Sequence, residues 1–110
     1  MKVGIIRCMQ TEDLCTGTTD FKFIREKRGA FADVAEEIEI VGFANCGGCP
    51  GKKAAMRAKM LVSRGADTIA FASCVQRGTP LGYPCPFAEK MNEIVKNAVG
   101  SDIRILDYTH

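Results

Sequence analysis

The sequence has no long apolar run and no block of charge of one sign. No segment approaches the roughly 20 apolar residues that a membrane-spanning helix needs, and the first apolar run is too short for a signal peptide. The 15 Lys and Arg residues nearly balance the 13 Asp and Glu residues, which leaves a net charge of +2. No basic stretch is interleaved with aromatic residues, as nucleic-acid surfaces often are. These absences argue against a membrane or a nucleic acid as a partner and favour a cytoplasmic protein.

Three common phosphate- or nucleotide-binding motifs are also missing. Leu14, six residues after Cys8, stands where a Cys-x5-Arg phosphatase loop would need arginine. The stretch Gly51-Lys52-Lys53 lacks the upstream glycine and the following Ser or Thr of a P-loop. No Gly-x-Gly-x-x-Gly follows the first apolar run, so the dinucleotide fingerprint is absent too. The sequence therefore offers no motif for phosphate cradling or for a dinucleotide cofactor.

The chain does contain six cysteines in 110 residues, together with a single histidine. In a reducing compartment this density favours metal ligation or thiol chemistry over disulfide bonds. Two of the cysteines form the motif Cys46-Gly47-Gly48-Cys49, which follows an apolar run. Two thiols separated by two residues can bind one metal ion or close a redox disulfide, and glycines let the backbone turn tightly.

Apolar runs and segments of helical periodicity alternate along the chain. The predicted strands are residues 2–7, 38–44, 67–73 and 103–106, and the predicted helices are residues 21–38, 52–64 and 87–99. Near-continuous apolar strands are typical of parallel sheets covered on both faces. With right-handed crossovers, the sequence predicts one domain over residues 1–110, an α/β three-layer sandwich of Rossmann-like or flavodoxin-like type. Its four-stranded, mostly parallel sheet carries helices on both faces.

This topology is expected to bring most of the cysteines to one edge of the sheet. Three of them directly follow predicted strands, one lies three residues further on, and one precedes a predicted helix. Ligands of parallel α/β sheets bind at the carboxyl edge of the strands, and the histidine also follows the last strand. The predicted metal ligands are therefore Cys46, Cys49, Cys74, Cys85, Cys8 and His110.

Proline follows two of these cysteines, in Cys49-Pro50 and Cys85-Pro86. Proline is common at the first position of a helix, so each cysteine is predicted to lie at or near a helix N-terminus. The positive end of the helix dipole favours a thiolate, which is the form that binds metal. Similarly, Thr19 or Asp20 is predicted to cap the helix that follows the first loop.

In the order of these elements the chain resembles the CGGC-domain proteins, small proteins of bacteria and archaea for which a metal-binding role has been suggested. The matching elements are Cys8 after the first strand, Cys46-Gly47-Gly48-Cys49-Pro50-Gly51, Gly65-Ala66-Asp67, Ser73-Cys74, Cys85-Pro86 and Thr109-His110. The resemblance implies metal binding, often taken to be of zinc, and implies no enzymatic activity. Some members have a further histidine before the Cys-Pro pair. Residues 77–82 contain none here, which leaves sulfur as the dominant ligand type.

Three functions stay open at the level of sequence. The first is metal binding, with zinc favoured over an iron-sulfur cluster because the cysteines come from separate strand ends and not from a compact ferredoxin run. The second is a thiol-disulfide oxidoreductase in which Cys46 and Cys49 cycle. The third is a carrier or sensory module that passes metal or sulfur to a partner. The sequence also leaves open whether the chain is an enzyme and whether it binds a protein partner or forms a homodimer.

Overall fold

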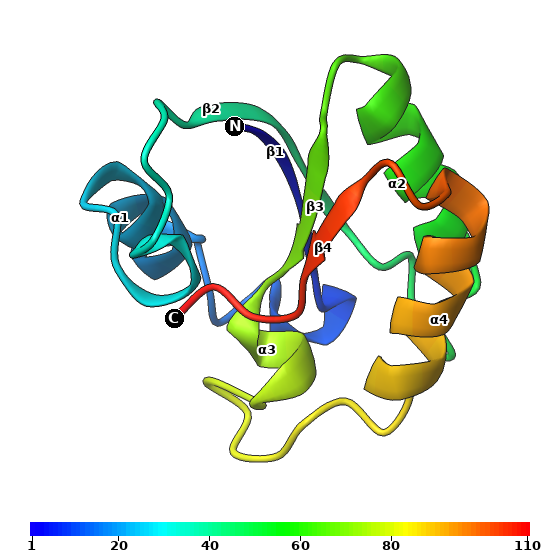
Figure 1. Cartoon of the computed structure of the whole chain (residues 1–110). Coiled ribbons are helices and arrows are strands. Elements are labelled where there is room, and N and C mark those ends of the chain that lie inside the picture. Colours follow the sequence, from blue (N-terminus) through cyan, green and yellow to red (C-terminus); the bar gives the residue numbers. More distant parts are fainter.

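A four-stranded parallel sheet forms the centre of the computed structural model, which describes residues 1–110 (Figure 1). Its strands are β1 (Lys2–Arg7), β2 (Glu39–Asn45), β3 (Thr68–Phe71) and β4 (Arg104–Leu106), in the spatial order β2-β1-β3-β4. Each of the three neighbouring pairs is parallel. This order matches the first four strands of a flavodoxin-like sheet. The predicted α/β fold with a parallel sheet is confirmed.

Helices cover both faces of the sheet. Helix α1 (Thr18–Arg25) lies on one face, and α2 (Lys53–Ser63) and α4 (Ala88–Val99) pack side by side on the other (Figure 1). Short helix α3 (Ser73–Gln76) and the 3-10 turns η1 (Met9–Thr11) and η2 (Gly29–Phe31) complete the chain. None of these helices has the length and apolar character needed to cross a membrane.

The hydrophobic core lies on both faces of the central strands β1 and β3. Ile5, Ile6 and Ile69 are fully buried, as the near-continuous apolar runs predict. On the face covered by α4, the core includes the buried Met91 and Val95. Complete burial of one such side chain stabilises the fold by about 1.5–3 kcal/mol, so these two strands anchor the rest of the sheet.

Helix α2 lies close to the sheet because glycines lie beneath it. Gly4 of β1 pairs with Gly42 of β2, and both face the side chain of Leu61. A Cβ atom at Gly42 would lie 2.6 Å from Leu61 Cδ2, and one at Gly4 would lie 2.8 Å from Leu61 Cδ1. Both separations are too short for carbon atoms. The glycine pair therefore sets the distance between α2 and the sheet. That distance in turn fixes the position of the loop that precedes the helix.

The prediction of one helix over residues 21–38 is wrong. Helix α1 ends at Arg25, and Gly29 takes a left-handed conformation with φ of 56°. The chain then turns into η2, where the Ala30 N–H donates a hydrogen bond to the carbonyl of Thr109 at 3.3 Å. Helix α1 therefore does not continue, and the segment that follows it packs against the C-terminal residues instead. The three- and four-residue apolar spacing arose from a helix followed by a 3-10 turn.

The proline residues do not open the helices that follow them. Helix α2 begins at Lys53, three residues after Pro50, and α4 begins at Ala88, two residues after Pro86. Gly51, with φ of 88°, completes a turn before α2 can start. The cysteines that precede these prolines are consequently not N-cap residues. Cys49 and Cys85 still lie shortly before these helices, and stabilisation of their thiolates by a helix dipole stays a prediction.

Candidate functional site

The paired ends of β1 and β2 hold Cys8 and Cys46 side by side. The register of the two strands runs to Arg7 opposite Asn45, and the Cys46 N–H donates to the Arg7 carbonyl at 2.8 Å. Cys8 and Cys46 are both buried, with exposed fractions of 7% and 5%. Their backbone positions are therefore fixed by the sheet itself.

Cys74 and Cys85 reach the same edge through α3. Strand β3 ends at Phe71, earlier than predicted, so Cys74 lies inside α3 and does not directly follow a strand. The Cys85 N–H donates to the carbonyl of Val75 at 2.8 Å, which ties the Cys-Pro pair to that helix. In turn, the Cys8 N–H donates to Cys74 Sγ at 3.2 Å. Hydrogen bonds therefore link α3 to the end of β1 on one side and to Cys85 on the other.

The Cys-Gly-Gly-Cys segment is a tight turn made by residues 46–51. Its glycines all have positive φ: 83° at Gly47, 97° at Gly48 and 88° at Gly51. Side chains disfavour this left-handed region, which glycine enters freely. Asn45 Oδ1 accepts the Gly47 N–H at 2.7 Å and fixes the start of the turn. As a result Cys46 faces inward, whereas Cys49 is exposed.

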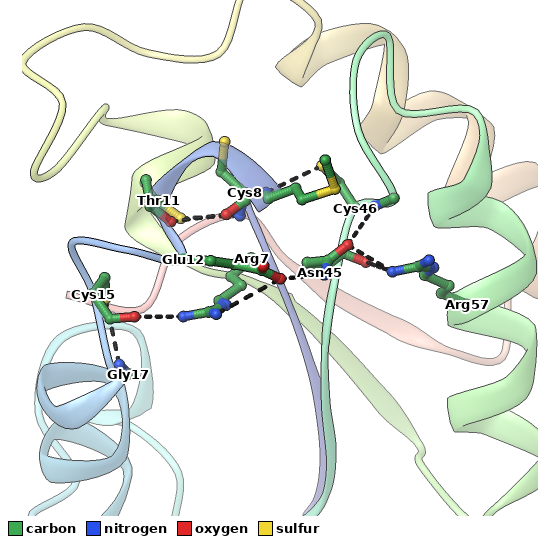
Figure 2. A network of polar contacts seen from close by, with 12 residues as sticks. Arg7, Cys8, Thr11, Glu12, Cys15, Gly17, Asn45, Cys46 and Arg57 are labelled. Carbon is green, nitrogen blue, oxygen red and sulfur yellow. Dashed lines mark hydrogen bonds and ion pairs between the residues drawn. The ribbon is translucent and has the colours of Figure 1, made fainter.

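A polar network beside the cysteines joins the first loop to α2 (Figure 2). Arg57 Nη1 donates to Asn45 Oδ1 at 2.6 Å, and the Asn45 amide donates to Glu12. Arg7 lies 3.8 Å from the Glu12 carboxylate and donates to the carbonyl of Cys15 at 2.5 Å. This network holds the loops after β1 and β2 against each other.

Five cysteines line two adjoining cavities at this edge. The inner, more enclosed cavity has room of about 10 Å³, roughly one water-sized sphere. Its lining consists of Cys8, Cys46, Cys49 and Cys85 with Pro50, Gly51, Val75, Phe87 and Met91. The outer cavity, of about 380 Å³, is lined by Cys8, Cys49, Cys74 and Cys85 with Gln10, Leu81, Tyr83 and Pro86. No basic side chain lines either cavity.

Backbone N–H groups point at three of these sulfurs. Besides the bond from Cys8 to Cys74 Sγ, Met9 N–H lies 3.5 Å from Cys46 Sγ, and Phe87 N–H lies 3.4 Å from Cys85 Sγ. Donors aimed at sulfur favour a thiolate over a thiol. Sequence reasoning missed Met9 and Phe87, because nearly every residue has a backbone N–H and the residue type does not show which of them points at a sulfur.

Burial has the opposite and larger effect on three of the thiols. It raises the pKa of Cys8, Cys74 and Cys85 above their ordinary value of 9.0, and the backbone N–H groups offset only part of that rise. Negative charge on Cys46 raises the pKa of Cys8 further, and negative charge on Cys49 and on Cys46 raises the pKa of Cys85. These thiols are therefore protonated at neutral pH unless a cation joins them, because no basic side chain lines the cavities around them.

The thiols gather round a cavity without forming a closed ligand cage. No three Cys, His, Asp or Glu side chains are arranged closely enough to hold a metal ion. Cys8 and Cys46 are fixed at strand ends, whereas Cys49 and Cys85 lie on loops. Cys49 and Cys85 are therefore the residues that would have to move to close the site round an ion.

His110 and Cys15 lie apart from the five other cysteines. His110 Nε2 is 3.6 Å from Asp20 Oδ1, and its ring lies 5.5 Å from that of Phe23. Together with Cys15 it lines a separate cavity of about 200 Å³. The structure thus does not bring His110 to the cysteines with which it is predicted to share a metal ion.

Asp20 is a further residue whose place the sequence did not reveal. The prediction of a helix cap at this point is wrong, because the N-cap of α1 is Gly17 and Asp20 is buried inside the first turn. The Asp20 carboxylate accepts a hydrogen bond from the Thr109 hydroxyl and lies beside His110. The sign of its role is that a buried carboxylate lies next to the only histidine. This proximity arises from contacts between residues far apart in the chain, so the sequence does not show it.

The fold and the site define a small cysteine-rich α/β protein with thiols at the carboxyl edge of a parallel sheet. The sequence profile of the CGGC domain matches residues 2–110, and the chain belongs to this family. An uncharacterized protein of Methanocaldococcus jannaschii is 38% identical over 117 residues, which cover 100% of this chain and 87% of that protein. A second uncharacterized protein of the same organism is 38% identical over 52 residues, 46% of this chain and 74% of its own length. No solved structure matches the chain. The predicted family is thereby confirmed.

Proposed function

We propose that this protein binds one metal ion through the thiolates of Cys8, Cys46, Cys49 and Cys85. The observation that carries the proposal is that these four cysteines line one small, enclosed cavity. Its room of about 10 Å³ is close to that of a single water-sized sphere. Four thiolates round one ion form the tetrahedral set that zinc takes in sites built from four cysteines.

The charge of the site supports the same conclusion. Deprotonating several neighbouring thiols builds up negative charge, and mutual repulsion contributes to the raised pKa of Cys8 and Cys85. No Lys, Arg or His lines the cavity to offset that charge. A divalent cation supplies the positive charge that offsets the thiolates. The N–H groups aimed at Cys46 and Cys85 favour the thiolate form that the ion needs.

Zinc is favoured over an iron-sulfur cluster because of size. A cluster carries several iron and sulfide atoms, whereas the inner cavity has room for about one sphere. Cys74 is left outside the proposed ligand set, since it lines only the outer cavity.

A carrier role is the second candidate, and the outer cavity favours it. That cavity has about 380 Å³ of room and shares Cys8, Cys49 and Cys85 with the inner one. A thiol from a partner could therefore reach three of the ligands and take the ion by exchange. A purely structural zinc site is closed and lacks such access.

The test is metal and sulfide analysis of protein purified without oxygen, together with its visible spectrum. We expect a colourless protein with about one zinc per chain, the stoichiometry of a single tetrahedral site. A brown protein with matching iron and acid-labile sulfide would replace zinc by a cluster at the same thiols. Disulfide reductase turnover that survives chelation and is lost in Cys46→Ser would replace metal binding by redox chemistry.

A further inference from the structure

The C-terminal segment crosses the carboxyl edge of the sheet and is fixed there by a buried hydroxyl group. After β4 the chain runs past α3 to α1 (Figure 1), and Thr109 is fully buried. The Thr109 hydroxyl donates to the carboxylate of Asp20 in α1, a residue that is 2% exposed. The same oxygen accepts the N–H of Ser73, the first residue of α3, at 3.2 Å. One hydroxyl group therefore joins α1 to α3.

The hydroxyl of Ser73 uses its whole hydrogen-bonding capacity on this segment. It donates to a backbone oxygen of His110 at 2.7 Å and accepts the N–H groups of Thr109 at 3.2 Å and of His110 at 2.8 Å. A serine hydroxyl has one hydrogen to donate and two lone pairs that accept, so all of its positions are occupied. A buried network that is satisfied in this way specifies one arrangement, because loss of one member leaves the others unpaired.

Helix α3 depends on such contacts because it is only four residues long. A single helical turn is not stable on its own. The carbonyl of Ser73 accepts the N–H groups of Arg77 at 2.8 Å and of Gly78 at 3.0 Å. The C-terminal segment, by holding Ser73, therefore fixes both the start of α3 and the first bend of the loop that follows it.

The loop from α3 to Cys85 folds back on α3. Gly78 lies directly against Tyr83, since a Cβ atom at Gly78 would clash with the Tyr83 backbone. The Cys85 N–H donates to the carbonyl of Val75 at 2.8 Å. Cys74 lies within α3 itself, and its sulfur accepts a hydrogen bond from the end of β1. Cys74 and Cys85 therefore both take their positions from α3.

We propose that Asp20 and Thr109, acting through Ser73, are positioning residues for Cys74 and Cys85. The C-terminal segment holds α3 in place, and its release lets α3 and the loop to Cys85 open as one unit. Cys85 is one of the four proposed metal ligands, so the effect of these residues on a bound ion rests on the proposed function. Their effect on the two thiols does not.

The reactivity of Cys74 in the metal-free protein tests this role. The rate at which iodoacetamide modifies each cysteine is followed by peptide mass spectrometry. Cys46 is the matched control, because Cys74 and Cys46 are 4% and 5% exposed and the Cys46 N–H is bonded to β1 and not to α3. Thiols buried to this degree react when the structure around them opens. Thr109→Val should accelerate Cys74 at least about 10-fold, the effect of losing one hydrogen bond to a charged group, and leave Cys46 unchanged.

Two milder variants grade the effect of the hydroxyl. Thr109→Ser keeps the hydroxyl and should return the rate at Cys74 to near that of the unmodified protein. Asp20→Asn keeps an acceptor for the Thr109 hydroxyl without its charge, so it should accelerate Cys74 less than Thr109→Val does. If Thr109→Val is folded by circular dichroism and Cys74 gains no rate relative to Cys46, the proposal is wrong.

Amide hydrogen exchange of the unmodified protein tests the same opening if Thr109→Val does not fold. The Thr109 N–H donates to Ser73 Oγ, and the Cys85 N–H donates to the carbonyl of Val75. Amides that open in one step have the same protection. We therefore expect equal protection factors for Thr109 and Cys85, below those of β1. Clearly unequal protection of these two amides would overturn the proposal.

Zinc release separates this role from the metal site. In Thr109→Val the transfer of bound zinc to a chromophoric chelator should be at least about 10-fold faster, because the loop that carries Cys85 opens more often. Thr109→Ser should release zinc as slowly as the unmodified protein. A protein that binds no zinc, or whose release is unchanged in Thr109→Val, would count against Cys85 as a ligand. The rates at Cys74 would then still decide the role of Asp20 and Thr109.

Discussion

The backbone N–H of Cys8 donates a hydrogen bond to Sγ of Cys74 at 3.2 Å, across 66 residues of sequence. Both residues are buried, with exposed fractions of 7% and 4%. The bond joins the end of β1 to α3 and thereby links two of the elements that position the thiols. Cys74 thus has a structural role as a hydrogen-bond acceptor.

That bond predicts different outcomes for two substitutions of Cys74. Cys74→Ser keeps an acceptor for the Cys8 N–H, whereas Cys74→Val leaves this buried donor without a partner. We expect Cys74→Val to lower the free energy of unfolding by about 1–3 kcal/mol relative to Cys74→Ser, measured with urea. Zinc content of Cys74→Ser should stay near that of the unmodified protein. Loss of its zinc would place Cys74 among the ligands.

Substitution of either cysteine of the turn should abolish most metal binding. Cys46→Ser and Cys49→Ser each remove a thiolate from the inner cavity. Loss of an outer-shell partner already lowers metal affinity about 10- to 100-fold, so loss of a ligand should lower it by more than about 100-fold. Zinc retained after dialysis against a weak chelator measures this, with Cys15→Ser as the matched control. Full zinc content in both turn variants would refute the ligand assignment.

Zinc binding should release protons and weaken as the pH falls. Burial, with repulsion from neighbouring cysteines, holds the pKa of Cys8 and Cys85 above 9.0, so both thiols carry protons in the metal-free protein at neutral pH. Each loses its proton on ligation, and at least about two protons should therefore be released per zinc at pH 7. Calorimetry in buffers of different ionisation enthalpy measures this number. A value near zero would contradict ligation by these two residues.

The metal-free protein should lose stability on the alkaline side. The thiols of Cys8, Cys74 and Cys85 have a raised pKa in the folded chain, so folding favours their protonated form. Their contribution to stability is complete below the ordinary thiol pKa of 9.0 and is lost as the pH rises above it. Urea unfolding in the presence of a chelator should show this decline from about pH 9 upward. A smaller slope is expected for Cys74→Ser, and a stability that rises over this range would contradict the direction.

The contact between α2 and the sheet can be tested by overpacking. Gly42→Ala forces a methyl group against Leu61 and should lower the free energy of unfolding by about 1–3 kcal/mol. Shortening the opposing side chain in Gly42→Ala/Leu61→Ala should cost less than the sum of the two single changes. If the changes in the free energy of unfolding are additive, residues 42 and 61 do not clash in the Gly42→Ala variant.

The sheet was predictable because its central strands, β1 and β3, are buried on both faces and therefore appear in the sequence as apolar runs. The ends of β1 and β2, and with them the positions of Cys8 and Cys46, followed from that pattern. The segment after Arg25 was not predictable, because its course depends on a hydrogen bond to Thr109 at the far end of the chain. The spacing of apolar residues indicates which residues are buried. A short helix followed by a 3-10 turn can bury the same residues as one long helix, so the spacing does not distinguish the two.

The grouping of the thiols was predictable only in part. The rule that ligands gather at the carboxyl edge placed five cysteines correctly near one another. The same rule placed His110 with them, but the edge is wide enough to carry separate cavities. His110 lies beside α1 because it pairs with Asp20, and this contact between residues distant in sequence has no local signal.

The division of the thiols between strand ends and loops has a kinetic consequence. Cys8 and Cys46 sit on the ends of paired strands, so they move only when the sheet itself opens. Cys49 and Cys85 lie on loops, which open locally at a much lower free energy than global unfolding requires. We therefore expect the residence time of a bound ion to follow loop opening, with amide hydrogen exchange fast in the loops and slow in β1. If the protein binds an ion as proposed, that ion is expected to leave and return many times while the molecule stays folded.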